Sequence, residues 1–207
     1  ETLGSATVIC TDKTGTITEN KMSLAKLFLL STNKIFRPED QLSDDEKQLI
    51  ETAMWASEPI PFDPMEVALH QTYQDIFPSD LRPNYELVFE YPLGGKPPMM
   101  THVFQEKSGR RIIAAKGAPE ALMNVSNLSE NEKLQIKEAI LLLANEGYRV
   151  LGVGKSNFEG NDYPKLQQDL PFEFKGIVAF YDPPKKNIQK VLEDFYEAGI
   201  DVKIITG

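Results

Sequence analysis

The sequence predicts an α/β fold in which an α+β domain interrupts a second domain of parallel α/β type. Residues 5–11 form an apolar, β-branched run, typical of a buried strand. The chain closes on a strand–helix–strand pattern, whose final strand is expected to be buried at residues 201–205. Hairpins and helices fill residues 28–172 between them. An insertion into an interrupted α/β layer explains this order.

The first predicted strand leads into the turn Asp12-Lys13-Thr14-Gly15-Thr16. Gly15 lets the backbone approach a ligand closely, and successive backbone N–H groups in such a turn hold phosphate oxygens. An aspartate attacks a phosphoryl group directly and forms an acyl phosphate. Mg²⁺ and Lys13 would offset the repulsion between the two anions. We therefore predict Asp12 as a nucleophile that becomes phosphorylated.

Thr14 stands two positions after this aspartate and bears on the class of reaction. Phosphatases built on such an aspartate carry a second aspartate there, as general acid and base. Threonine cannot take that role, so the phospho-aspartate is expected to persist long enough to be used. Two alternatives stay open: a soluble dehalogenase-like phosphatase with a cap domain, and a nucleotide-binding module without chemistry of its own.

Three helix starts are marked by capping residues in the middle of the chain. Capping boxes at Ser43–Glu46 and Ser129–Glu132 predict helices to about residues 57 and 146. Asp63-Pro64-Met65-Glu66 predicts a third helix to about residue 77. A last helix is expected from Asp182-Pro183-Pro184-Lys185 onward. The predicted strands of the middle cover residues 22–30, 85–91, 99–106, 110–116, 148–155 and 172–181.

The composition narrows the classes of function. The chain has 207 residues, is 41% hydrophobic and carries a formal net charge of −9, which argues against a broad nucleic-acid surface. Its single cysteine, Cys10, excludes an internal disulfide and is expected in the core of the first strand. No run of about 18 apolar residues is present, so direct membrane insertion is not expected. Both ends look cut, which suggests a soluble part of a longer protein.

Four motifs together resemble the P-type ATPases. They are Asp12-Lys13-Thr14-Gly15-Thr16, Lys116-Gly117-Ala118-Pro119-Glu120, Asp182-Pro183-Pro184-Lys185 and Ile204-Ile205-Thr206-Gly207, in the order of that family and across the whole chain. The resemblance implies a nucleotide-binding (N) domain at residues 28–172. It also implies that residues 1–27 and 173–207 are parts of a haloacid-dehalogenase-like phosphorylation (P) domain.

The resemblance also implies a phosphorylation site. Asp12 would receive the γ-phosphoryl group of ATP, and the Asp12 carboxylate and the Thr14 carbonyl would be ligands of Mg²⁺. The other residues implied in this site are Lys13, Thr16, Asp182 and Thr206. Asp182 has an alternative interpretation as the N-cap of the last helix.

In the N domain the resemblance implies an ATP pocket. Glu66 would lie near the adenine, Tyr91 would stack on it, and Gly117 would let ATP approach the backbone. Simpler interpretations are a helix cap for Glu66 and an aromatic residue packed at a strand end for Tyr91. The cationic residues implied near the phosphates are Lys96, Lys116 and Arg149, of which Lys96 has an alternative as a solvated loop lysine.

The implied parent protein is an ion pump, with this part at the cytoplasmic face of a membrane. Its partners would be ATP and the membrane and actuator domains of the pump. The setting of Glu66, followed by Val67-Ala68-Leu69, favours the calcium-type branch. The family's later motifs, which complete the Mg²⁺ and phosphate site, are not in this sequence. We therefore expect this chain to bind nucleotide but not to turn ATP over.

Overall fold

The computed structural model describes residues 6–160 and 162–205, and Thr206 lies outside the described residues. The chain divides into two compact units, one of Glu1–Met22 with Asp182–Gly207 and one of Ser23–Tyr181. The sequence predicts these divisions at residues 27 and 172 instead. They differ because the strands Ser23–Leu29 and Phe172–Tyr181 pair with each other inside the larger unit.

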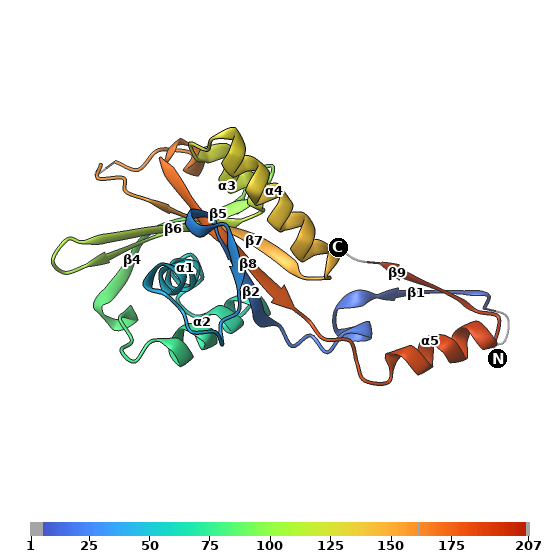
Figure 1. Cartoon of the computed structure of the whole chain (residues 1–207). Coiled ribbons are helices and arrows are strands. Elements are labelled where there is room, and N and C mark those ends of the chain that lie inside the picture. Colours follow the sequence, from blue (N-terminus) through green and yellow to red (C-terminus); the bar gives the residue numbers. More distant parts are fainter. Residues whose placement is uncertain (1–5, 161, 206–207) are drawn as a thin grey trace. The chain divides into compact units, whose positions relative to one another are not determined.

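A seven-stranded sheet forms the centre of the larger unit (Figure 1). The strand order is β3-β2-β8-β7-β6-β5-β4, and every neighbouring pair is antiparallel. The predicted strands are all present, and a short seventh one joins them at the edge. Their bounds are β2 Ser23–Leu29, β3 Lys34–Phe36, β4 Tyr85–Gly94, β5 Met99–Glu106, β6 Arg111–Gly117, β7 Arg149–Ser156 and β8 Phe172–Tyr181.

Helices cover both faces of this sheet (Figure 1). On one face lie α1 (Asp44–Trp55) and α2 (Pro64–Ile76), and on the other lie α3 (Pro119–Val125) and α4 (Glu130–Asn145). The predicted capping boxes are confirmed at the starts of α1 and α4, and Asp63 caps α2 as expected. Short 3-10 turns occur at Leu30–Thr32, Arg82–Asn84 and Gln167–Asp169.

Alternation along the strands separates the two faces of the sheet. In β6, Ile113 and Ala115 pack into a core with residues of α3 and α4, such as Leu122 and Ile136. Ala114, between them, packs with Trp55 of α1 and residues of β5. Residue 116 therefore points to the face that α1 and α2 cover, which places Lys116 beneath those helices.

The smaller unit contains a parallel pair of strands, β1 (Val8–Asp12) and β9 (Asp201–Ile205), with α5 (Ile188–Glu197). Their parallel pairing agrees with the α/β pattern in the sequence. The expectation that both strands are buried is wrong: Val8 is 44% exposed, Ile205 is 60% exposed and Cys10 is exposed. Within the described residues these strands form a two-stranded sheet, so most of their apolar surface stays uncovered.

The last helix starts later than predicted, at Ile188 instead of Asp182. Pro183 and Pro184 disfavour helical backbone in the residues before them. The segment pairs with the loop after β1: the backbone N–H of Lys185 donates to the Ile17 carbonyl at 2.9 Å, and that of Glu19 to the Pro183 carbonyl at 2.9 Å. No helix within the described ranges is long and apolar enough to span a membrane.

Candidate functional site: a buried lysine beside an apolar cavity

Lys116 is the centre of the candidate site in the larger unit. Its side chain is almost fully buried, and its ammonium group donates to Glu66 Oε1 at 2.5 Å, to the Ala56 carbonyl at 2.8 Å and to Ser57 Oγ at 3.2 Å. These three acceptors satisfy the three N–H bonds of the ammonium. A buried cation is stable only with such partners, so the sheet and the two helices hold this charge in one position.

Glu66 comes from the first turn of α2. The cap of this helix is supplied by Asp63, whose carboxylate accepts from the Met65 N–H at 2.8 Å, so Glu66 does not take the capping role. Its Oε1 accepts from Lys116 and, at 3.3 Å, from the backbone N–H of Glu58. Within the described residues, its buried Oε2 has no hydrogen-bond partner. That oxygen is a buried acceptor whose hydrogen-bonding capacity is unused.

Burial lowers the pKa of Lys116 below its ordinary value, and the neighbouring Glu66 carboxylate opposes that shift. The pair therefore sits where water is largely excluded and where charge–charge interactions are stronger than in solvent. A ligand that reaches this pair gains more from each polar contact than it would at the surface.

A cavity of about 370 Å³ opens beside the pair. This volume lies in the range of small-molecule sites. Its walls are mainly apolar and include four charged residues. The lining residues are Glu58, Phe62, Asp63, Met65, Glu66, Pro92, Leu93, Met100, Lys116, Gly117 and Leu151.

Gly117 lines this cavity, but its need for glycine comes from the sheet. A Cβ built there would lie 2.5 Å from both Met99 Cα and the Pro98 carbonyl oxygen. Contacts that short do not occur between such atoms, so β5 can approach β6 this closely only next to a glycine. Close packing of the strands is thus one reason for a glycine at position 117. The resemblance implies a second reason, which is room for ATP to approach the backbone.

Arg149 begins β7, and its backbone alternation places it on the same face as Leu151, which lines the cavity. Lys96 lies in the exposed loop between β4 and β5 and is not among the lining residues. The structure therefore brings Arg149 to the correct face of the sheet and does not bring Lys96 to the cavity.

Tyr91 lies on the opposite face from Lys116. It is in register with Thr101, packs in the core with Met99 and Val103, and its hydroxyl donates to the Pro164 carbonyl at 2.6 Å. Its neighbours along the strand, Glu90 and Pro92, are the residues that lie toward the α1–α2 side. The expectation that Tyr91 joins Glu66 and Lys116 in one pocket does not agree with this geometry, because strand alternation turns the ring away.

Phe62 is the aromatic residue at the cavity that the sequence analysis missed. It lies just before the N-cap of α2, its side chain is 84% exposed, and it lines the cavity together with Leu93 and Met100. A large apolar residue between Pro61 and Asp63, ahead of a helix start, was the available signal. Phe62 and Leu93 are both large, mostly exposed apolar side chains at one cavity, and such a group indicates a contact surface.

In the smaller unit, Asp12 is the exposed last residue of β1, and the turn Lys13–Ile17 follows it. Gly15 has φ +78°, a conformation that favours glycine. Lys185 Nζ donates to the Gly15 carbonyl at 2.7 Å. The turn is therefore held by a side chain of the 182–185 segment. Thr14 is partly buried and Thr16 is exposed in this turn.

Asp182 holds the chain just beyond this turn. Its carboxylate accepts from Thr18 Oγ1 at 2.5 Å and from the backbone N–H of Lys21 at 3.1 Å. Asn187, and not Asp182, stands at the N-cap position of α5, so the capping alternative for Asp182 is wrong. Thr206, the remaining predicted member of this site, lies outside the described residues.

Comparison with known proteins identifies the family of this chain. Residues 60–187 match the family described as P-type ATPase, cytoplasmic domain N. The chain is similar along its whole length to Calcium-transporting ATPase 1 of Saccharomyces cerevisiae (28% identical, 26% of that protein covered). It is similar in the same way to a probable cation-transporting P-type ATPase of Mycoplasma genitalium (32%, 23% covered) and to a calcium-transporting ATPase of Bacillus subtilis (28%, 28% covered).

The chain thus spans about a quarter of the length of these curated relatives. The family match covers more than half of the chain and includes α2, the lining residues of the cavity other than Glu58, and the Asp182 segment. The mixed fold, with its large antiparallel sheet between helices, is consistent with a nucleotide-binding domain of this family. The chain belongs to the P-type ATPase family, in which it contains cytoplasmic domain N.

Proposed function

We propose that this chain binds ATP in the cavity beside Lys116, as the nucleotide-binding part of a cation-transporting P-type ATPase. The observation that carries the proposal is a buried, fully bonded ammonium group at one side of an apolar cavity of about 370 Å³. Such a cavity offers a surface for a flat base and a fixed positive charge for an anionic group. The names of the relatives, which include calcium- and cation-transporting ATPases, support the same function.

The adenine ring would lie between the apolar side chains of Phe62, Leu93 and Met100. Aromatic stacking on a base contributes about 1–3 kcal/mol and does not depend on the base. Selectivity would come from Glu66 Oε2, the buried acceptor without a partner. The 6-amino group of adenine can donate to this oxygen, whereas the 6-carbonyl of guanine would face it with a second acceptor.

The phosphates would extend toward cationic groups. Lys116 supplies one positive charge, and Arg149 lies on the same face of the sheet at the start of β7. A planar guanidinium binds phosphate oxygens in pairs, which suits this role. Lys96 stays a proposed phosphate contact only if its loop moves when nucleotide binds.

In the whole pump, Asp12 would accept the γ-phosphoryl group and thereby drive cation transport. Asp12 and the Thr14 carbonyl would hold Mg²⁺, and this all-oxygen donor set fits the ion. Bound there, Mg²⁺ neutralises charge on the transferred group. Lys13, Thr16, Asp182 and Thr206 would complete this site. The membrane and actuator domains would be the partners, at the cytoplasmic face of the membrane, and calcium is the favoured cation.

The chain by itself is proposed to bind ATP without turning it over. The test is a titration of the ¹⁵N-labelled chain with ATP, followed through its amide shifts. Phe62→Ala should weaken ATP binding about 5- to 100-fold through lost stacking. Ile60→Ala is the matched control, because Ile60 is 86% exposed in the same loop and does not line the cavity. Equal affinities of the two variants would contradict the proposed cavity.

The same titration with GTP tests the role of Glu66. The chain should prefer ATP, and Glu66→Gln should reduce that preference because an amide can present a donor to guanine. Robust hydrolysis of p-nitrophenyl phosphate by the chain would instead favour a dehalogenase-like phosphatase. That result would contradict two proposals: that the parent protein is a pump, and that this chain binds ATP without turning it over.

A further inference from the structure

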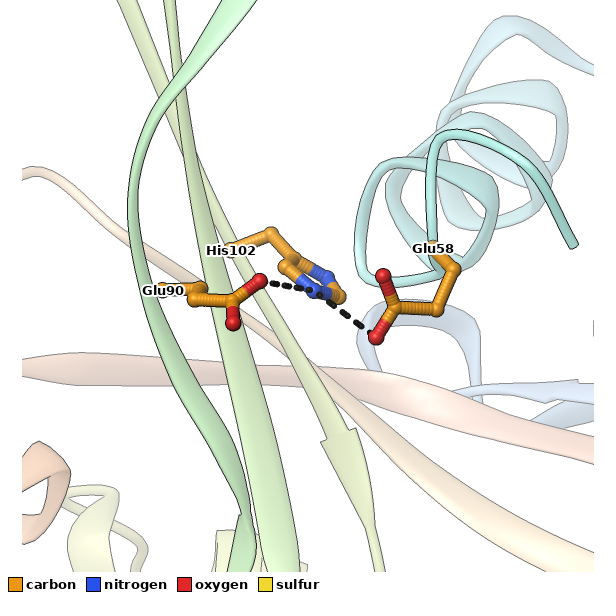
Figure 2. Close-up of side chains that lie close together, drawn as sticks. All are labelled: Glu58, Glu90 and His102. Carbon is orange, nitrogen blue, oxygen red and sulfur yellow. Dashed lines mark ion pairs between the residues drawn. The ribbon is translucent and has the colours of Figure 1, made fainter.

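Three side chains converge beside the cavity, from three separate segments of the larger unit (Figure 2). Glu58 follows α1, Glu90 lies on β4 and His102 lies on β5, where it is in register with Glu90. Nε2 of His102 is 3.7 Å from Glu58 Oε1 and 3.9 Å from Glu90 Oε2. One potential ligand atom from each residue lies within 4.8 Å of the other two.

His102 is the buried member of this cluster, with only 1% of its surface exposed. Figure 2 shows its ring edge directed between the two carboxylates. Its distances to their oxygens exceed those of hydrogen bonds. Nδ1 also has no hydrogen-bond partner among the described residues. A nearly fully buried imidazole therefore points into an acidic cluster without being bonded to it.

The charge state of this imidazole suits a metal ligand. Burial and, second to it, the nearby Lys116 ammonium lower the pKa of His102, and Glu90 and Glu66 are among the groups that act in the opposite direction. The neutral form of an imidazole offers one ring lone pair to a metal ion. The carboxylates then lack a positive partner in the ring, although they face it.

The spacing also suits a metal ion. Ligand atoms at the usual 2.0–2.2 Å from a tetrahedral Zn²⁺ lie about 3.4 Å from one another. The two observed separations from Nε2 exceed this value by a few tenths of an ångström. Glu58 is half-buried and Glu90 is exposed, so small rotations of their side chains can close the difference.

We infer that Glu58, Glu90 and His102 form a binding site for a divalent transition-metal cation of the Zn²⁺ type. One imidazole and two carboxylates form a ligand set that Zn²⁺ accepts, with a fourth position left for water. The positive charge of Lys116 opposes the ion, but the carboxylates of Glu58, Glu66 and Glu90 outnumber this one ammonium group. The two carboxylates of the site then balance the charge of the ion.

This site is separate from the proposed Mg²⁺ site at Asp12 and Thr14. Mg²⁺ prefers oxygen ligands alone, whereas an imidazole selects Zn²⁺ and related ions. It is also linked to the cavity, because Glu58 lines it and the Glu58 backbone N–H donates to Glu66. An ion that fixes Glu58 would therefore order the loop between α1 and α2.

The test is a titration of the metal-free chain with Zn²⁺ and no nucleotide, followed through the imidazole ¹⁵N signals. The chain has two histidines, so His70 serves as an internal control. Its Nδ1 already lies 2.8 Å from Arg82 Nη1, and it is not part of the cluster. One equivalent of Zn²⁺ should shift Nε2 of His102 and leave His70 unchanged. A tenfold excess of Mg²⁺ should not displace the ion.

Variants give a second readout. Glu90→Gln and Glu58→Gln should each weaken Zn²⁺ affinity at least about tenfold, as the loss of a ligand or its support does in known sites. Glu86→Gln is the matched control, since Glu86 is an exposed glutamate on the same strand. Unchanged affinity in both cluster variants, or a shift at His70 instead of His102, would overturn the inference. Neither result depends on ATP binding.

Discussion

The two units of this chain contain similar apolar strands in opposite environments. In the larger unit, β6 lies between two neighbouring strands and between helices on both faces, and Ile113 is fully enclosed. In the smaller unit, β1 pairs with β9 alone among the described residues, and both strands expose apolar side chains. An apolar run thus predicts a strand, while burial depends on which elements cover it.

The two candidate sites differ in the same way. Lys116 is held by three hydrogen bonds inside a core, so its position is fixed before any ligand arrives. Asp12 is exposed at a strand end, and the contacts around it position the following turn and loop. The proposed nucleotide site is therefore preorganised, whereas the region of Asp12 is less so. We expect the free energy of unfolding to depend strongly on Lys116.

The largest expected effect is on the buried pair in the larger unit. Lys116→Met should lower the free energy of unfolding by about 3–5 kcal/mol, because Glu66 would remain buried without a partner. Urea unfolding followed by circular dichroism measures the change. Lys137→Met is the matched control on exposed α4 surface, where a change within about 0.5 kcal/mol is expected.

Adding Glu66→Leu to Lys116→Met removes the unpaired carboxylate and should restore much of the lost stability. If the single and double variants are equally unstable, the loss comes from packing and not from the orphaned charge. The contrast between a buried, preorganised charge and the exposed Asp12 would then lose its electrostatic basis.

A second effect compares the two hydrophobic environments directly. Leu122→Ala removes a fully buried side chain between α3 and the sheet and should cost about 2–5 kcal/mol. Ile205→Ala on the exposed β9 should change the free energy of unfolding by less than about 0.5 kcal/mol. A large effect of Ile205→Ala in urea unfolding would show that this strand is covered in solution.

The same contrast explains how far the sequence predicted the fold. The capping residues Ser43, Asp63 and Ser129 act within a few residues, so the helix starts followed from local sequence. Burial of Cys10 did not follow, because it depends on neighbours that local sequence does not specify. Two prolines moved the start of α5 to Ile188, a local effect that the sequence analysis did not weigh.

The candidate site, like the fold, could be predicted from the sequence only in part. Lys116 and Glu66 meet although they are distant in sequence, and only the resemblance to a family had placed them together. Tyr91 lies on the face opposite Lys116, because the side of a strand residue depends on register and a shift of one residue reverses the face. Phe62 and His102 were not predicted as site residues, since their roles rest on contacts between separate segments.

A smaller effect concerns the buried histidines of the larger unit. Burial lowers the pKa of His102, which faces Glu58, Glu90 and Lys116, and the pKa of His70, which faces Arg82. Below pH 6.5 the histidines of the unfolded chain bind protons that the native histidines do not bind. The free energy of unfolding should therefore decrease as the pH is lowered.

For each histidine that stays neutral in the native state, the slope should average about 0.7 kcal/mol per pH unit between pH 7.5 and 5.5 and approach about 1.4 at lower pH. Urea unfolding between pH 7.5 and 5.5 measures it. His70→Gln should remove the contribution of one histidine and make the slope shallower. A slope that this variant leaves unchanged would mean that His70 is protonated in the folded chain as easily as in the unfolded one.

The smallest expected effect lies in the smaller unit, at Asp182. Asp182→Asn weakens the bonds from Thr18 and from the Lys21 N–H, and should cost about 1 kcal/mol or less because these bonds are partly exposed. Hydrogen exchange should show faster exchange at the Lys21 amide, with no change at amides of β6. Faster exchange in β6 as well would mean that the two units unfold together and that their different burial does not make them independent.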